Sequence, residues 1–339
     1  MFEWTAVFSA ILSFAITLLL GFVVIPYLHK LKFGQTILDI GPVWHKNKQG
    51  TPTMGGIMFI IGVVVSIFVS VVLGNFISDK IAADLAEEHR IVPLIAGVGL
   101  ALGMAFIGFV DDYIKVVKKR NLGLTAKQKT FMQLIVSAAY LASMYLGGMT
   151  YTKIPFIGVV DITKGFGLLF WPIAVVFIYG FTNAVNLTDG VDGLASSVTT
   201  VVSAFFIAAS VIFTQYRLCT VAACAFIGGC LGFLIWNKHP AKVFMGDTGS
   251  MFLGGMAVAL SFMVEMPIIL MLAGVVYFWE AISVVIQVAY YKRTKKRIFK
   301  MTPIHHHYEM SGWSENKICF VFSVVAIVGC AVALLLFLY

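Results

Sequence analysis

Charged residues are scarce in this sequence. Only 12% of its 339 residues are Asp, Glu, Lys or Arg, whereas 60% are hydrophobic and the mean hydropathy is +0.95. A soluble globular domain is about half apolar, so this composition excludes that class. It predicts instead a polytopic membrane protein.

Cysteines are few, and they form no recognisable framework. All five lie within apolar runs, at Cys219, Cys224, Cys230, Cys319 and Cys330. They lack the spacing of metal ligands and the pairing of an external disulfide framework, so we interpret them as small core residues. Linkers, low-complexity tracts and repeats are lacking as well. We therefore expect a single integral-membrane domain over residues 1–339.

Long apolar runs, by contrast, are abundant. A helix that rises 1.5 Å per residue needs about 20 residues to cross the hydrocarbon core, and on this basis we expect an all-α protein with about ten transmembrane helices. The predicted spans are Ala6–Leu28, Met54–Leu73, Ile91–Val110, Thr130–Leu146, Phe166–Phe181, Leu194–Phe213, Leu218–Trp236, Ser250–Val264, Pro267–Tyr291 and Ile318–Leu338. The first lacks a small-residue cleavage site and is predicted to be a retained anchor.

The basic residues are distributed very unevenly over the loops between these spans. Of the 24 Lys and Arg residues, all fall on one side except Lys80, Arg90, Lys153, Lys164 and Arg217. The rich side is predicted to be cytoplasmic, which places both termini outside. This bias explains the net charge of +8 without a nucleic-acid partner, and it favours anionic lipids and substrates. On the outer side, the alternating stretch Tyr151–Ile162 predicts a structural hairpin.

Two adjacent carboxylates, Asp111 and Asp112, end the apolar run that begins at Ala101. Neighbouring carboxylates repel one another unless a cation or a proton is present, so the pair suggests metal binding, general-base chemistry or both. If the helix continues, Lys115 shares a face with Asp111. The alternative is a solvated pair at a helix end.

The first cytoplasmic loop holds Lys48 before the Thr51–Gly56 stretch, and the second holds Lys127. Lysines beside glycines, hydroxyls and a helix N-terminus can bind phosphate. The alternative for the first loop is an ordinary basic loop with a Thr-Pro helix start.

The third loop contains no Lys or Arg but carries Asn186, Asp189 and Asp192 at intervals of three. A continued helical turn would align these side chains on one side. The spacing does not fit a calcium loop, and N-capping would need only one of the three residues. We interpret them as parts of a binding site.

The last two cytoplasmic loops add further candidates. One has Asn237, Phe244, Gly246 and Asp247, where Asp247 could cap a helix and Phe244 could stack on a base. The other has His305, His306 and His307, which point about 100° apart in a helix and so do not suit one metal. One or two of them could contact an anion. Carboxylates for Mg²⁺ together with Lys and His for phosphates are the components of phosphoryl transfer.

These motifs resemble one family. Asp111-Asp112, NAVNLTDGVD at Asn183–Asp192, FMGDTGS at Phe244–Ser250 and PIHHHYE at Pro303–Glu309 closely resemble the MraY-type phospho-N-acetylmuramoyl-pentapeptide transferases, and TPTMGG at Thr51–Gly56 fits too. The resemblance implies a Mg²⁺-dependent enzyme of peptidoglycan synthesis in the bacterial cell membrane. It would transfer phospho-MurNAc-pentapeptide from UDP-MurNAc-pentapeptide to undecaprenyl phosphate, giving lipid I and UMP. The family is often dimeric, which makes a homodimer possible.

The resemblance also implies residue roles. Asp247 would bind Mg²⁺ with Asp111 and Asp112 beside it, and Asp111 would remove a proton from the lipid phosphate. Residues implied to contact the nucleotide are Asn186, Asp189, Asp192, Asn237, Phe244 and Gly246. Residues implied to contact phosphates or sugar are Lys48, Lys115, Lys127, His305, His306 and His307.

Two other functions remain open at this stage. The related enzymes that transfer GlcNAc-1-phosphate to a polyprenyl phosphate share the aspartates but differ in the histidine motif. A transporter would carry ions on charged groups near the bilayer midplane, where Glu280 is the only strong candidate.

Overall fold

The protein is described here by a computed structural model that covers residues 4–31, 48, 50–117, 123–212 and 216–338. Helix dominates, because in apolar surroundings a helix satisfies its own backbone hydrogen bonds. The helices are α1 (Trp4–Lys30), α2 (Gly56–Ile77), α3 (Asp79–Ala86), α4 (Glu88–Val117), α5 (Ala126–Leu146), η2 (Gly165–Leu169), α6 (Phe170–Thr188), α7 (Leu194–Ile212), α8 (Arg217–Asn237), α9 (Gly246–Met263), η4 (Pro267–Ile269), α10 (Leu270–Ala273), α11 (Val275–Thr294), α12 (Ile304–Glu309) and α13 (Glu315–Phe337).

The all-α class is confirmed, and each predicted span coincides with helix. Within the described residues, seven helices are long and apolar enough to cross a membrane, or eight if one bent pair counts as a span. The seven are α1, α2, α4, α6, α7, α8 and α13. The predicted spans at α5 and α9 are helical but do not reach that apolarity.

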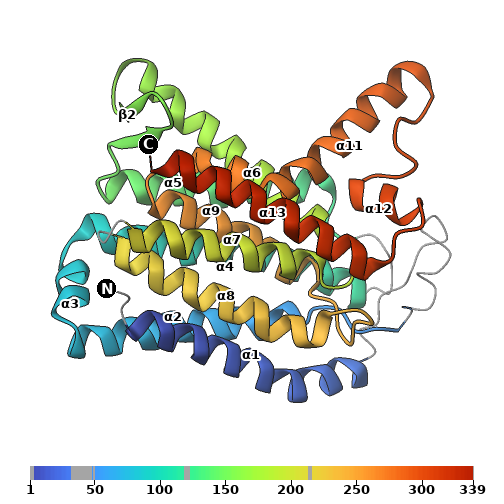
Figure 1. Ribbon diagram of the computed structural model, residues 1–339, viewed down its shortest axis with the longest axis horizontal. Coiled ribbons are helices and arrows are strands. Elements are labelled where there is room, and N and C mark those ends of the chain that lie inside the picture. Colours follow the sequence, from blue (N-terminus) through green and yellow to red (C-terminus); the bar gives the residue numbers. More distant parts are fainter. Residues whose placement is uncertain (1–3, 32–47, 49, 118–122, 213–215, 339) are drawn as a thin grey trace.

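The predicted span over Pro267–Tyr291 is helical but broken. The segment forms η4 and α10, breaks at Gly274, and continues as α11 at an angle of 82°. A Cβ on Gly274 would lie 2.8 Å from the Leu270 carbonyl oxygen, so the break needs a glycine. Figure 1 shows α11 rising away from the bundle towards the end where α12 lies.

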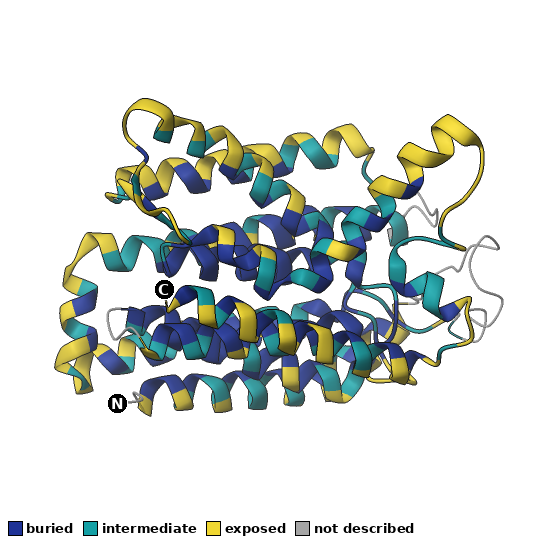
Figure 2. Ribbon diagram, turned by 45° about the horizontal axis from the view of Figure 1, so that its top comes forward, coloured by how far each residue is buried: buried dark blue, intermediate teal, exposed yellow. Residues whose placement is uncertain are grey.

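Helix α9 forms the centre of the bundle. Every residue from Thr248 to Met263 is buried, and Figure 2 shows burial concentrated on the inner helices, with exposed residues on the outward faces. Small residues permit this packing. A Cβ on Gly255 would lie 2.8 Å from Ala101 Cα in α4, and one on Gly254 would lie 2.7 Å from Thr182 Cα in α6.

The predicted hairpin is confirmed. Strands β1 (Tyr151–Ile154) and β2 (Gly158–Asp161) pair antiparallel. They lie at the same end of the bundle as α3 and both chain ends, opposite α12 (Figure 1). The five cysteines are free and buried or nearly so, as expected.

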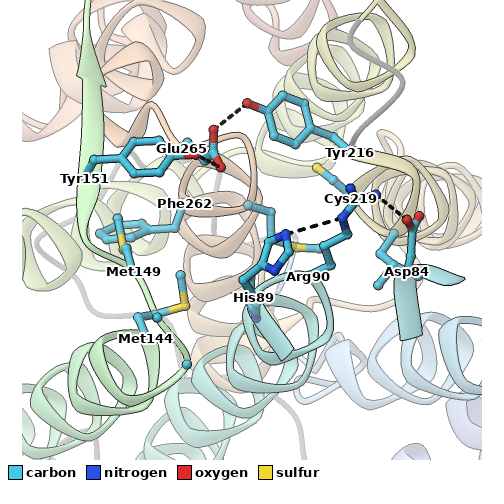
Figure 3. Close-up of a pocket in the computed structure, with 15 residues that line it drawn as sticks. Asp84, His89, Arg90, Met144, Met149, Tyr151, Tyr216, Cys219, Phe262 and Glu265 are labelled. Carbon is cyan, nitrogen blue, oxygen red and sulfur yellow. Dashed lines mark hydrogen bonds and ion pairs between the residues drawn. The ribbon is translucent and has the colours of Figure 1, made fainter. Parts of the chain in front are cut away.

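A cavity of about 370 Å³ opens beside the hairpin, with Asp84, Arg90, Tyr151 and Glu265 in its wall (Figure 3). Buried Asp84 pairs with Arg90 of α4 and accepts two hydrogen bonds from Arg217, at 2.6 and 2.7 Å. These ion pairs connect α3, α4 and α8, so we assign this end of the molecule a structural role.

Candidate active site

The carboxylate pair projects from the last turns of α4. Because the helix continues to Val117, Asp111 and Lys115 share a face as predicted, and Lys115 Nζ lies 2.5 Å from Asp111 Oδ2. The other oxygen of Asp111 accepts the Leu124 backbone N–H at 2.7 Å. Asp111 therefore connects α4 with the segment that enters α5.

Asp112 binds the beginning of α9. It accepts the backbone N–H groups of Asp247 at 3.2 Å and Thr248 at 2.9 Å, and also the Thr248 hydroxyl at 2.7 Å. The first N–H groups of a helix have no partner within it, and they favour a negative charge. Asp112 thus acts as a cap supplied by another helix. Gly246, at φ +71°, allows this approach, because a Cβ there would lie 2.5 Å from Asp112 Oδ2.

Asp247 is surrounded by cations and an amide. Lys115 Nζ and Lys129 Nζ lie 3.1 and 3.0 Å from its Oδ2, and Asn186 donates to its Oδ1 at 2.9 Å. The sequence analysis missed Lys129, which lies in the first turn of α5 two residues after the predicted Lys127 and on a different face of the helix. Lys127 itself is exposed and forms no ion pair with another described residue.

Asp111, Asp112 and Asp247 can each offer an oxygen, and these oxygens lie within 4.8 Å of one another. An all-oxygen set of this kind suits a hard cation such as Mg²⁺. The donor chemistry therefore fits the ion that the sequence predicted. Two lysines beside the carboxylates supply positive charge for phosphate groups.

The predicted alignment of Asn186, Asp189 and Asp192 is wrong. Helix α6 ends at Thr188, so only Asn186 stays in helical register, and Asp192 turns away to a second cluster. Asp189 follows the helix end and remains partly accessible. Desolvation by the surrounding protein, together with the charges of Asp247 and Asp112, raises the pKa of Asp189 to about 8.

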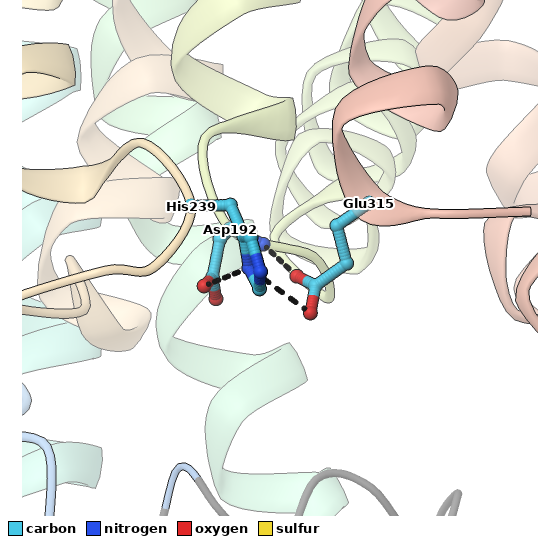
Figure 4. Close-up of side chains that lie close together, drawn as sticks. All are labelled: Asp192, His239 and Glu315. Carbon is cyan, nitrogen blue, oxygen red and sulfur yellow. Dashed lines mark hydrogen bonds and ion pairs between the residues drawn. The ribbon is translucent and has the colours of Figure 1, made fainter.

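The second cluster contains Asp192, His239 and Glu315, which Figure 4 shows side by side, and also Lys48. Lys48 Nζ lies 2.7 Å from Asp192 Oδ1 and 2.6 Å from Glu315 Oε2, while His239 Nδ1 lies 3.0 Å from Asp192 Oδ2. Burial alone would lower the Lys48 pKa, but hydrogen bonds and charge from Asp192 and Glu315 raise it. The set includes a ring nitrogen, so it suits Mg²⁺ less well than the three aspartates.

Sequence reasoning missed Glu315 and His239. Glu315 is in the first turn of α13, where an acidic residue is common for helix stability alone. It also accepts the Asp192 backbone N–H at 2.9 Å. Only the folding of α13 against α7 reveals this role.

Asn237, the last residue of α8, and Phe244 lie on either side of His239 in the chain, before α9 begins. Asn237 is buried and links two loops, because its side chain accepts the Gly193 N–H at 3.1 Å and donates to the Val243 carbonyl at 2.9 Å. Phe244 is half-buried, and its backbone pairs with Pro52 and Gly55 at 2.9 Å each. Pro52 and Gly55, which precede α2, are thereby joined to the loop between α8 and α9.

The histidines lie on α12 and have separate surroundings. His305 is fully buried, and its Nδ1 lies 3.0 Å from Glu280 Oε2. His306 Nδ1 lies 2.8 Å from Glu309 Oε2, and His307 accepts the Lys300 N–H at 3.1 Å. The three side chains thus have different partners, and the expectation that they do not share one metal stays a prediction.

Carboxylates and lysines gather at one end of this helical membrane protein, as a membrane phosphosugar transferase requires. Comparison with known proteins identifies the same class. Residues 94–265 match the model described as "Glycosyl transferase family 4". Residues 48–60 match "Phospho-N-acetylmuramoyl-pentapeptide-transferase signature 1".

Curated relatives with the same family name match this chain over nearly their whole length. The chain is 46% identical to the phospho-N-acetylmuramoyl-pentapeptide-transferase of Acetivibrio thermocellus, covering 96% of this chain and 93% of the relative. It is 43% identical to that of Halalkalibacterium halodurans, covering 99% and 98%. The chain belongs to the phospho-N-acetylmuramoyl-pentapeptide transferase family.

Proposed function

We propose that this protein transfers phospho-MurNAc-pentapeptide from UDP-MurNAc-pentapeptide to undecaprenyl phosphate, forming lipid I and releasing UMP. The observation that carries the proposal is the convergence of Asp111, Asp112 and Asp247 with Lys115 and Lys129, in a chain with full-length relatives of that name. The protein acts as a multi-pass protein of the bacterial cell membrane.

Asp247, with Asp111 and Asp112 beside it, would hold Mg²⁺. When bound, the ion would neutralise the donor diphosphate and polarise its phosphoryl oxygens. Lys115 and Lys129 would hold the remaining phosphate charge, since each ammonium already lies about 3 Å from Asp247. Chelation with EDTA should therefore stop UMP release, and added Mg²⁺ should restore it. Unchanged turnover in EDTA would remove the metal from the proposal.

The transfer is proposed as a single displacement. An oxygen of the lipid phosphate forms a bond to the sugar-bearing phosphorus, and the bond from that phosphorus to the bridging oxygen breaks, so that UMP leaves with the electron pair. Any proton on the lipid phosphate would pass to Asp111. Asp111 suits this task better than Asp112, because Asp111 Oδ2 contacts the Lys115 ammonium, whereas both oxygens of Asp112 accept hydrogen bonds from the first turn of α9.

A covalent aspartyl-phosphate intermediate is the rival mechanism. The enzyme would be incubated with donor but without undecaprenyl phosphate, and Asp111 and Asp112 would be examined by peptide mass spectrometry. The single displacement predicts no phosphosugar adduct and no UMP burst. A stoichiometric adduct on either residue would replace it with the two-step route.

The remaining site residues are proposed to bind the donor. Asn186, Asp189, Asp192, Asn237, Phe244 and Gly246 would serve the nucleotide, while Lys48, Lys127, His305, His306 and His307 would serve phosphates or sugar. Lys48 pairs with Asp192, so we propose that it also contacts the nucleotide. For the others the proposal rests on the family motifs.

The membrane orientation is also proposed. The basic ends of α4 and α11 would face the cytoplasm, with ten spans and both termini outside, supported by the two chain ends lying at one end of the bundle (Figure 1). A homodimer remains a prediction. Fusing a reporter to each terminus tests the orientation, and the mass of the purified protein in detergent tests the dimer.

Donor specificity separates this function from GlcNAc-1-phosphate transfer. Purified protein would receive undecaprenyl phosphate, Mg²⁺ and either UDP-MurNAc-pentapeptide or UDP-GlcNAc, with UMP as the measured product. A site that pairs polar groups with one substrate rejects an analogue by orders of magnitude. We expect only the first donor to be used, and His306→Ala to lose most of that activity. Comparable UMP release from both donors would assign the protein to the other class.

A further inference from the structure

A fully buried carboxylate contacts the first histidine of the histidine motif. Glu280 of α11 and His305 of α12 both have no exposed surface, and Glu280 Oε2 lies 3.0 Å from His305 Nδ1. The same oxygen is 3.4 Å from the backbone nitrogen of His305. An ionisable side chain within a membrane helix is costly, and such residues usually serve function. The pairing removes the reason to interpret Glu280 as part of an ion path.

The contacts of Glu280 Oε2 define the tautomer of His305. A backbone N–H can only donate, so Oε2 faces it as an acceptor. We infer that Nδ1 also donates to this oxygen and carries the ring proton, because the partner of one ring nitrogen fixes the state of the other. Nε2 is then left as an acceptor.

His305 Nε2 faces the loop between α6 and α7. A Cβ on Gly190 would lie 2.1 Å from Nε2 and 2.7 Å from Cε1, so the ring edge rests directly against this glycine. Within the described part of the chain, Nε2 is buried and has no hydrogen-bond partner. A buried polar atom without a hydrogen-bond partner requires an explanation, and one such explanation is a role in the reaction. Gly190 directly follows Asp189 and is two positions before Asp192.

We propose that Glu280 is a positioning residue of the transferase, which holds the His305 ring in one tautomer and one orientation. In that orientation the Nε2 edge of the ring packs against Gly190 and supports the Asp189–Asp192 loop in the form that binds the donor. This inference rests on the proposed function, because it assigns that loop to the donor. It predicts that removing Glu280 weakens binding of UDP-MurNAc-pentapeptide and leaves binding of undecaprenyl phosphate unchanged. Groups that orient a functional histidine in this way typically change affinity or activity by about 10-fold or more when removed.

The kinetic test compares Glu280→Ala, Glu280→Gln and the control Ser283→Ala. Ser283 is a buried polar residue on the same helix, and its hydroxyl donates only to the Glu280 carbonyl at 2.7 Å. With each substrate varied in turn, Glu280→Ala should raise the KM for UDP-MurNAc-pentapeptide about 10-fold and leave the KM for undecaprenyl phosphate unchanged. Glu280→Gln should recover most of the loss, since its amide oxygen can still accept from Nδ1–H. Ser283→Ala should match the wild type.

Melting temperatures of the same variants separate positioning from simple support of the fold. If Glu280→Ala lowers the melting temperature but leaves both KM values unchanged at a permissive temperature, the positioning role is wrong. A double variant, Glu280→Ala with His305→Ala, should resemble His305→Ala alone, because Glu280 acts through the ring. Additive losses would also overturn the proposal.

A spectroscopic test does not depend on the substrate assignment. The test is nitrogen-15 NMR of protein labelled at its histidines, in which the signal of His305 is the one that disappears in His305→Ala. This signal should show the Nδ1–H tautomer in the wild type and a mixture of tautomers in Glu280→Ala. A wild-type Nε2–H tautomer contradicts the proposal even if the donor is correct. If the tautomer is as expected but UDP-MurNAc-pentapeptide releases no UMP, the proposed function fails and the pairing stands.

Discussion

Gly108 of α4 and Asp247 of α9 touch through their backbones: a Cβ on Gly108 would lie 2.1 Å from the Asp247 carbonyl oxygen. This contact sets the distance between the helix that carries Asp111 and Asp112 and the first turn that carries Asp247. The three carboxylates can approach one another because a glycine stands three residues before the pair.

Replacement of Gly108 by Ala should therefore damage catalysis. The methyl group must push the first turn of α9 away, and a displacement of about 1 Å at a reacting site can cost about 100-fold in rate. Gly99→Ala is the matched control on the same helix, since nothing lies within 4 Å of its Cβ position. UMP release should fall strongly in Gly108→Ala only. Equal activity of the two variants would show that the α4–α9 distance is not critical.

Asp247→Asn should remove nearly all turnover. The amide keeps the size of the side chain but loses the charge that Lys115 and Lys129 face at about 3 Å. Loss of one electrostatic contact at a reacting centre costs about 100-fold or more. Rates would be measured on protein whose melting temperature shows that it is folded. A folded variant with wild-type rate would exclude Asp247 from the reaction.

Asp189 should make stability fall as the pH rises. Its pKa in the folded protein is about 8, whereas an unfolded Asp has a pKa of about 3.9. Between these values the unfolded chain releases the proton and the folded protein retains it, so rising pH favours unfolding. Asp189→Asn removes this loss. In buffer without divalent cations, its melting temperature should exceed that of the wild type by a margin that widens up to about pH 8. A margin independent of pH would contradict the assignment.

The end of the molecule that carries α3 and the hairpin should matter for stability and not for chemistry. Asp84→Ala leaves Arg90 and Arg217 without their shared carboxylate, and removing one partner of a buried ion pair costs about 3 kcal/mol. Glu87→Ala is the control, because its carboxylate is exposed, unlike that of Asp84, and its pair with Arg90 should contribute under about 1 kcal/mol. We expect a lower melting temperature for Asp84→Ala only, with normal KM values below that temperature. A specific loss of donor affinity would contradict this.

Local periodicity predicted what lies within one element. The fourth-residue spacing of Asp111 and Lys115 gave their contact directly, since α4 continues past them. It failed where an element ends: Asn186 and Asp192 were expected on one side, but α6 stops at Thr188. The apolar run over Pro267–Tyr291 likewise conceals a break, because hydropathy does not register the bend at Gly274.

Contacts between distant segments were beyond local patterns. Lys48 and Glu315 are 267 positions apart and form an ion pair of 2.6 Å. Nothing in either local sequence predicts the other, and Glu315 looks like an ordinary acidic residue at a helix start. The meeting of Asp247 with the carboxylate pair was expected from family resemblance, whereas the cap that Asp112 forms on α9 required the structure.

The complete burial of α9 has a consequence for how the protein enters the membrane. From Thr248 to Met263 no residue faces outward, and the helix is not among the described helices that are apolar enough to cross a bilayer by composition. Its glycines suit the backbones of α4 and α6 rather than lipid. Such a segment should leave the insertion machinery only when those neighbours are ready to receive it. Because α9 carries Asp247, an incompletely inserted chain has the carboxylate pair without its third member, and we expect it not to release UMP.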